Sequence, residues 1–358
     1  MHGILKKSFI ILSLVLLSGC EEVVLEMGFT PEVVPTTVNQ TEISENEVYN
    51  GIVQSLRDMT MVSEYKKILD INDVSAIIEK IRLDYPEFFW VDGSRLTTTG
   101  DKSEVKIDII DDLSADEIEY MYDELVSCAD ALIESIPTGL DNYGKIVFVH
   151  DYIVNHTTYD TAGAESNENG LYGTAYGCLV QGNAICQGYS EAFQYIMKRL
   201  GIECGVCRGD TARGRHAWNY VNLNEKYYWL DVTWDDPVPE NNAPETLSHT
   251  YCLVDDERML RTRNADSDLK FIPKCYSMDN NYFVRNNTYI AYYSDEAISA
   301  VLDRYAEIGE VEIMFADEGS YSEAVERLFT DGDIWNFLDS EEISYTTDDI
   351  MCVLKITY

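Results

Sequence analysis

The chain has 358 residues, of which 46% are hydrophobic and 25% are charged, so it is long enough to bury one large core or two ordinary ones. Its 64 Asp and Glu residues outnumber its 26 Lys and Arg residues, which gives a formal net charge of −38. Such a chain repels nucleic acid, so we expect no nucleic-acid partner. The acidity is spread along the chain and forms no D-x-[DN]-x-[DN]-G loop, so a calcium site is not indicated.

The first twenty residues have the order of an export signal. Two lysines precede an apolar run over residues 9–17, which is too short to span a bilayer as a helix. The following Leu17-Ser18-Gly19-Cys20 resembles the lipobox of bacterial lipoproteins, which are cut before a cysteine that then carries the lipid. We therefore expect residues 1–19 to be a lipoprotein signal peptide and Cys20 to anchor the protein outside the cell, on the membrane. An ordinary secretory signal that happens to contain Cys20 is the alternative.

Residues 20–45 are rich in Pro, Thr and Glu and lack periodicity, which indicates a flexible linker. Residues 46–135 form a helical and strand-containing region, in which alternating Thr and Ile/Val over 91–110 suggest one or two strands. A capping box of Ser114 and Glu117 then begins a long helix that ends before Pro137.

The predicted core covers residues 136–285. It begins with a helix at about 143–155 and a Gly- and Asn-rich loop at 160–180. A helix from Cys186 to Leu200 follows. Three strands are then expected over residues 202–208, 216–223 and 226–234, and a loop-rich stretch over residues 237–287.

Residues 286–358 read as a small α/β region. The expected order is helix, strand, helix and two strands, over residues 295–306, 311–316, 320–329, 343–346 and 350–357. The whole pattern predicts an α+β protein, in which a helix that bears Cys186 packs on an antiparallel sheet.

Cys204 and Cys207 form a C-x-x-C, but the surrounding segment reads as a strand. Alternation along a strand sends positions three apart to opposite faces, which does not suit a shared metal. No second C-x-x-C or paired histidines complete a zinc site. We therefore expect two buried thiols here, no metal site and no required cofactor. A disulfide elsewhere in the chain stays open, because the protein is expected to be exported.

Cys186 lies where an acyl-transfer nucleophile is expected. It opens a helix, and the positive end of the helix dipole favours a thiolate there. Free backbone N–H groups at the same end, beginning with that of Cys186, can bind an oxyanion. Such a nucleophile also needs a base and a group that orients the base.

His216 and Asp231 meet this need if strands 216–223 and 226–234 form a hairpin with Asn224-Glu225 at its tip. His216 and Asp231 then lie on one face as diagonal neighbours, with Cα atoms roughly 7–8 Å apart. The weak point is the turn, because a tight hairpin prefers Asn-Gly. A four-residue loop keeps this arrangement, whereas a three-residue loop breaks it.

Three segments in order resemble the core of bacterial transglutaminase-like proteins: GNAICQGYSEAF at 182–193, HAWN at 216–219 and WLDVTWD at 229–235. The resemblance extends over about residues 85–240. It implies a papain-type fold with a catalytic triad of Cys186 as nucleophile, His216 as base and Asp231 as the acid that orients the base.

Three further residues have open assignments. Gln181 is a candidate side-chain donor to the oxyanion, as in papain-type sites, with a solvent-facing loop glutamine as the alternative. His150 and His156 are rival bases, but their Tyr and Asp neighbours favour structural roles.

The triad implies acyl transfer through a thioester and leaves the acceptor open. We expect a thiol enzyme that acts on peptide or protein amide bonds at the cell surface, cell-wall material included, with hydrolysis favoured over cross-linking. The alternative is a catalytically silent surface module that binds a partner in the same cleft.

Overall fold

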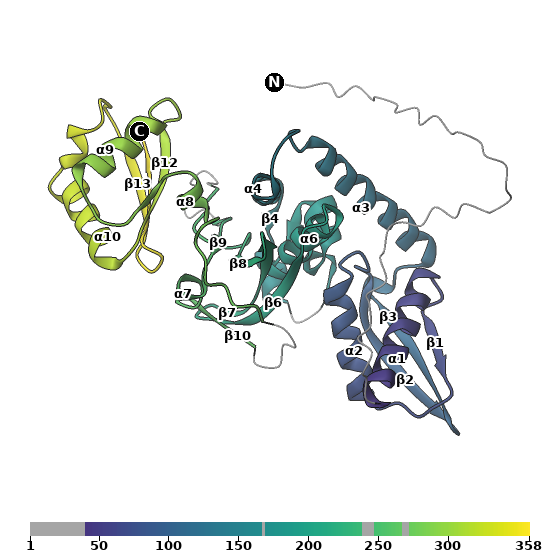
Figure 1. Cartoon of the computed structure of the whole chain (residues 1–358). Helices are drawn as coiled ribbons and strands as arrows, with labels where there is room; N and C mark the ends of the chain where they lie inside the picture. The colour runs from purple at the N-terminus through teal and green to yellow at the C-terminus, as the bar shows by residue number, and fades with distance from the viewer. Residues whose placement is uncertain (1–39, 167–168, 238–246, 267–271) are drawn as a thin grey trace, which may run out of the picture. The chain divides into compact units, whose positions relative to one another are not determined.

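The computed structural model describes residues 40–166, 169–237, 247–266 and 272–358 (Figure 1). The predicted signal peptide and Cys20 lie outside these residues. Residues Ser44–Tyr358 form one compact unit. Helix α1 (Gln40–Arg57) begins inside the segment predicted as a flexible linker, so that prediction is wrong for residues 40–45. Across the described ranges, no helix is both long and apolar enough to cross a membrane.

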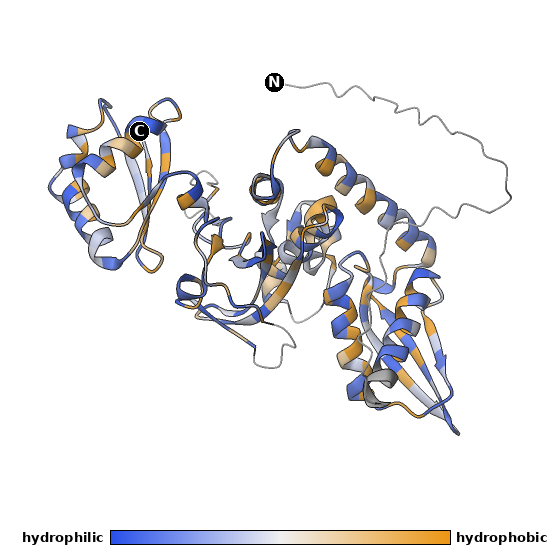
Figure 2. Cartoon of the chain, in the orientation of Figure 1, coloured by the Kyte–Doolittle hydropathy of each residue, from blue (hydrophilic) through white to orange (hydrophobic). Residues whose placement is uncertain are grey.

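The first part of the compact unit contains three helices and a three-stranded antiparallel sheet of order β1-β3-β2. After α1 these elements are β1 (Val62–Tyr65), α2 (Ile71–Asp84), β2 (Val91–Thr99), β3 (Lys102–Ile109), the short η1 (Ile110–Asp112) and α3 (Ala115–Ser135). The predicted capping box is confirmed, because the Ser114 hydroxyl accepts from the Glu117 N–H and the Glu117 carboxylate accepts from the Ser114 N–H. Figure 2 shows hydrophobic and hydrophilic positions alternating along α3, as expected for a helix with one buried face.

The segment that leads to Cys186 is more ordered than its composition suggests. Helix α4 (Asn142–His156) is followed by a two-stranded parallel pair. The residues predicted as a loop at 160–180 contain three short helical elements, so that prediction is wrong. In chain order, the two strands and three helical elements between α4 and α6 are β4 (Thr158–Tyr159), α5 (Thr161–Glu165), η2 (Leu171–Gly173), the π-helix η3 (Gly177–Gln181) and β5 (Asn183–Ala184).

A five-stranded antiparallel sheet of order β10-β6-β7-β8-β9 forms the centre. Its strands are β6 (Cys204–Thr211), β7 (Gly214–Leu223), β8 (Lys226–Leu230), β9 (Cys252–Val254) and β10 (Arg263–Ala265). Helix α6 (Cys186–Arg199) packs on this sheet (Figure 1). The buried Asn219 of β7 fixes the contact, because its side-chain amide donates to the Ser190 carbonyl of α6 at 3.0 Å. This arrangement confirms the predicted α+β class with a cysteine-bearing helix on an antiparallel sheet.

The β7–β8 hairpin has the predicted register. Asn219 pairs with Leu230 and Leu223 pairs with Lys226, so Asn224 and Glu225 form a two-residue turn. Both turn residues have positive φ, 56° and 64°, as a type I′ turn requires. The strand predicted over 226–234 is too long, because β8 ends at Leu230. After it, the Asp231 carboxylate accepts from the Trp234 N–H at 3.1 Å and stabilises a turn instead.

The two faces of the central sheet pack against different regions of the chain. One hydrophobic core runs from α1 through α6 and β8 to Leu253. A second core, which contains Trp218 and Trp229, joins the other face to Met314 and Val353 near the C-terminus. Cys204 packs against the first core and Cys207 lies in the second, which confirms that the two thiols lie on opposite faces.

The C-terminal region has a four-stranded sheet of order β11-β12-β14-β13 and its own core. The predicted helices and strands are present within a few residues of the expected bounds. The elements after β9 are α7 (Asp256–Met259), β10, α8 (Tyr282–Arg285), β11 (Tyr289–Ile290), α9 (Asp295–Tyr305), β12 (Glu310–Phe315), α10 (Glu318–Val325), η4 (Glu326–Thr330), η5 (Asp333–Asn336), β13 (Ser344–Asp348) and β14 (Val353–Thr357).

Candidate active site

Cys186 is the first residue of α6 and is half-buried. The Ile185 side chain gives the helix no capping hydrogen bond, so the first-turn N–H groups are not occupied by a capping side chain. The Ile185 N–H donates to the Tyr172 carbonyl at 2.9 Å, which holds the start of the helix. A Cβ at Gly188 would lie 2.7 Å from the same carbonyl oxygen, so glycine is needed for this close packing.

Seven other cysteines lie in the described ranges. All eight described cysteines are free thiols. Burial raises the pKa of the seven besides Cys186, to about 12 for Cys178 and Cys207. The remaining five are Cys128, Cys204, Cys252, Cys275 and Cys352. These seven thiols are therefore poor nucleophiles near neutral pH.

His216 and Asp231 are in direct contact. His216 Nε2 and Asp231 Oδ2 are 2.7 Å apart, and both side chains are buried. Burial alone would lower the pKa of His216, but the Asp231 carboxylate, with a hydrogen bond and charge from Cys186, raises it to about 9. With Nε2 held by Asp231, Nδ1 is the ring nitrogen that can exchange a proton with the Cys186 thiol. The structure thus brings the three predicted triad residues together.

Arg263 adds a fourth charged group that the sequence did not suggest. It lies on the edge strand β10, is fully buried, and forms an ion pair with Asp231 Oδ2. Burial would raise the pKa of Asp231, but the charges of His216 and Arg263 hold it at about 2. Asp231 is therefore an anion at every pH at which the protein is expected to work. A lone arginine in a loop-rich stretch carries no local signal of this role.

Aromatic rings enclose the imidazole and the guanidinium. The His216 ring stacks on Trp218 with centroids 5.9 Å apart, and Trp234 lies 5.5 Å from it. Trp234 also lies under the Arg263 guanidinium, 4.3 Å from ring centroid to Cζ. Trp218 is buried and Trp234 is half-buried, so Trp234 is the ring that can face a substrate.

Gln181 lies at the end of η3 and is exposed. It lines a surface cavity of about 330 Å³ with Asp160 and Tyr172. The role of Gln181 as an oxyanion donor stays a prediction.

The two rival histidines have other partners. His156 Nε2 is 3.1 Å from the Leu179 carbonyl oxygen. His150 is fully buried between Asp151 and Asp235, at 2.8 Å and 3.1 Å. These contacts occupy both histidines, as expected for structural roles.

Comparison with known proteins gives one family match that includes the three residues. Residues 130–233 match the transglutaminase-like superfamily, and this segment contains Cys186, His216 and Asp231. The chain is 27% identical over 124 residues to kyphoscoliosis peptidase of Homo sapiens, an alignment that covers 31% of this chain and 18% of the relative. The chain therefore spans less than a fifth of that relative.

Two solved structures are distantly similar. One is a TGase, at 16% identity and a TM-score of 0.30, with 51% of this chain and 53% of that chain covered. The other is a candidate cysteine protease from Cytophaga hutchinsonii, at 13% identity and a TM-score of 0.27, with 53% and 81% covered. The predicted resemblance is supported over residues 130–233, the segment that matches the transglutaminase-like superfamily.

Proposed function

We propose that the transglutaminase-like domain of this chain is a thiol acyl-transfer enzyme that acts on peptide or protein amide bonds. The observation that carries the proposal is the contact of His216 with Asp231 at 2.7 Å beside a cysteine that opens a helix. The raised pKa of His216 supports it, because an imidazolium next to Cys186 stabilises a thiolate.

The proposed reaction has two halves. In the first, the Cys186 proton moves to His216 Nδ1 and the sulfur attacks the amide carbonyl carbon. First-turn N–H groups of α6 stabilise the oxyanion, and the C–N bond then breaks as His216 returns the proton to the leaving amine. In the second, His216 takes a proton from water, whose oxygen attacks the thioester carbonyl carbon. The C–S bond then breaks, and His216 returns the proton to the Cys186 sulfur. The products are a carboxylic acid and the free thiol.

Hydrolysis is the proposed outcome, because the half-buried Cys186 leaves the thioester open to water. We also propose that the mature chain is held on the outer face of the membrane through Cys20, beside cell-wall and surface proteins. The sequence over residues 1–20 supports this location.

Thiol labelling tests the triad. Iodoacetamide is expected to modify Cys186 before the seven buried or partly buried thiols, as read by peptide mass spectrometry. His216→Ala should slow that labelling at least tenfold, whereas the matched control His156→Ala should not. Equal labelling rates in wild type and His216→Ala would overturn the triad and favour the silent binding module.

The acceptor is tested with mixed peptides, an amine donor and ¹⁸O water. Hydrolysis places ¹⁸O in a new carboxyl group, whereas transamidation joins the amine donor to the same carbonyl carbon as a new amide. Cys186→Ala should abolish either product.

A further inference from the structure

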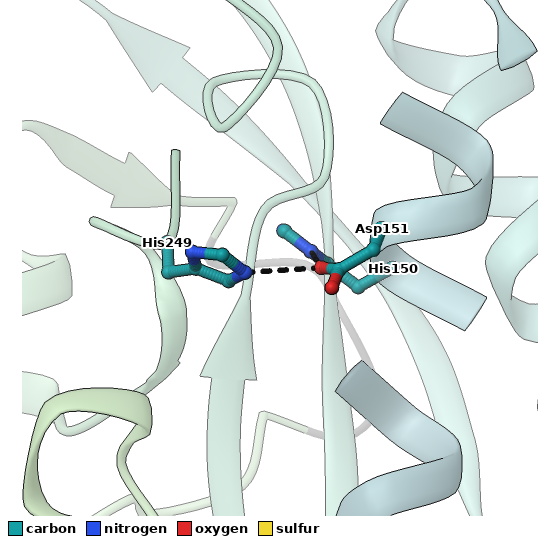
Figure 3. A group of neighbouring side chains, drawn as sticks. All are labelled: His150, Asp151 and His249. Atoms are coloured by element: carbon teal, nitrogen blue, oxygen red, sulfur yellow. Dashed lines mark hydrogen bonds and ion pairs between the residues drawn. The ribbon is translucent and has the colours of Figure 1, made fainter. Parts of the chain in front are cut away.

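A second group of chemically active side chains lies between α4 and the C-terminal region. His150 and Asp151 are adjacent on α4, and His249 lies in the segment before β9 (Figure 3). One donor atom from each residue lies within 4.8 Å of the others. Asp151 Oδ1 is 2.8 Å from His150 Nδ1 and 3.0 Å from His249 Nε2, so one carboxylate oxygen joins the two rings. The triad uses none of these three residues.

Each imidazole is held on its other nitrogen by a further carboxylate. His150 Nε2 is 3.1 Å from Asp235, and His249 Nδ1 is 2.7 Å from Glu312 of β12. The Tyr282 ring stacks on His249 with centroids 3.6 Å apart and planes 1° apart, which fixes the ring orientation. Histidine ligands of metals are oriented in this way, by a carboxylate on the nitrogen that does not bind the ion.

The group is rich in buried carboxylates, whose charge is balanced by protonated imidazoles or by a bound cation. Three carboxylates surround two imidazoles, and the side chains of Asp235, Glu312 and both histidines are at most 8% exposed. Anions at this density are costly to bury without positive charge. The Asp151 side chain is 33% exposed, so the group has an opening to solvent on that side. An ion can therefore reach the group from this side.

We propose that His150 Nδ1, His249 Nε2 and the Asp151 carboxylate bind a divalent transition-metal ion of the zinc class, with water as the fourth ligand. Two imidazoles and one carboxylate suit zinc and its neighbours better than calcium or magnesium, which prefer oxygen ligands alone. The ion replaces the two hydrogen bonds that now join the rings to Asp151. Because Glu312 belongs to β12, the bound ion also ties the C-terminal region to α4.

Binding is tested on the folded full chain with Zn²⁺ by equilibrium dialysis and elemental analysis. Wild type is expected to bind one ion per chain. Asp151→Asn and His249→Gln each remove one ligand and should weaken binding at least a hundredfold. His156→Gln, on the same helix, is the matched control and should bind as wild type does. Cys186→Ala should also bind normally, which separates this proposal from the proposed catalytic function.

The thiols of this chain can also bind Zn²⁺, so the atoms that coordinate the ion must be identified directly. X-ray absorption at the zinc edge is expected to show nitrogen and oxygen at about 2.0–2.1 Å and no sulfur at about 2.3 Å. Glu312→Gln keeps all three ligands and should weaken binding about tenfold or more through loss of orientation. Sulfur coordination, unchanged affinity in Asp151→Asn and Glu312→Gln, or no binding to the folded wild type would each overturn the proposal.

Discussion

Arg263 and His216 bind the same oxygen of Asp231, one as an ion pair and the other at 2.7 Å. The carboxylate therefore divides its charge between the residue that exchanges protons and a cation that is fully buried. This arrangement limits how far Asp231 can raise the pKa of His216, and it makes the orienting acid a structural ion pair as well.

Arg263→Met should change both stability and the titration of His216. Breaking a buried ion pair is expected to cost about 3 kcal/mol of the free energy of unfolding. Loss of the cation should also move the pKa of His216 upward from about 9, an effect that a purely structural arginine would not have. Urea unfolding and the pH profile of kcat/KM measure the two effects. The control Arg215→Met removes an exposed pair with Asp266 and should cost about 1 kcal/mol or less.

The pH dependence follows from the direction of the His216 shift. Its pKa is raised from 6.5 to about 9, so the imidazolium that protonates the leaving amine persists through neutral pH. We expect kcat/KM to fall as pH rises through about 9. The stability that His216 contributes should be fully present below 6.5 and be lost over the same alkaline range. A wild-type profile that is flat through pH 9, in a chain still folded by circular dichroism, would contradict this assignment.

Glu225→Gly should stabilise the chain. Glu225 has φ of 64° at the second position of the β7–β8 turn, where a side chain is strained and glycine is not. The expected gain in unfolding free energy is a few tenths to about 1 kcal/mol, because glycine also loses more backbone entropy on folding. Glu225→Ala keeps the strain and should give no gain. Denaturant midpoints of the three proteins decide between a strained and a relaxed turn.

Cys20→Ser should release the chain from the membrane. If residues 1–20 are a lipoprotein signal, the substituted chain lacks the thiol that carries the lipid, so cell fractionation should find it in the soluble extracytoplasmic fraction. Cys128→Ser is the control and should stay with the membrane. Mass spectrometry of the amino-terminal peptide gives a second readout, and an unlipidated Cys20 in the wild-type chain would contradict the prediction.

The local features of the site were predictable from the sequence. The start of α6 at Cys186 and the register of the β7–β8 hairpin depend on neighbouring residues, and hairpin pairing then places His216 near Asp231. The capping box of α3 is equally local. In each case a short segment contains all of the groups that interact, so spacing alone predicts the contact.

The long-range features were not predictable in the same way. Arg263 and His249 lie in the stretch after β8, whose edge strands have only three residues each and no alternating pattern. Arg263 is 32 positions from Asp231, and His249 is 98 positions from Asp151. Nothing in the neighbourhood of either residue signals its partner, because the partner is supplied by the tertiary fold.

The second core of the central sheet has a consequence for the order in which the protein is made. Trp218 and Trp229 are covered in part by Met351 and Val353, which lie more than a hundred residues later in the sequence. Synthesis proceeds from the amino terminus, so this part of the sheet face stays uncovered until residues 351–353 have been made. We expect His216, which stacks on Trp218, to reach its final surroundings only after that segment has folded onto the sheet. A chain cut before Met351 would therefore disturb the centre from a distance of more than a hundred residues along the sequence.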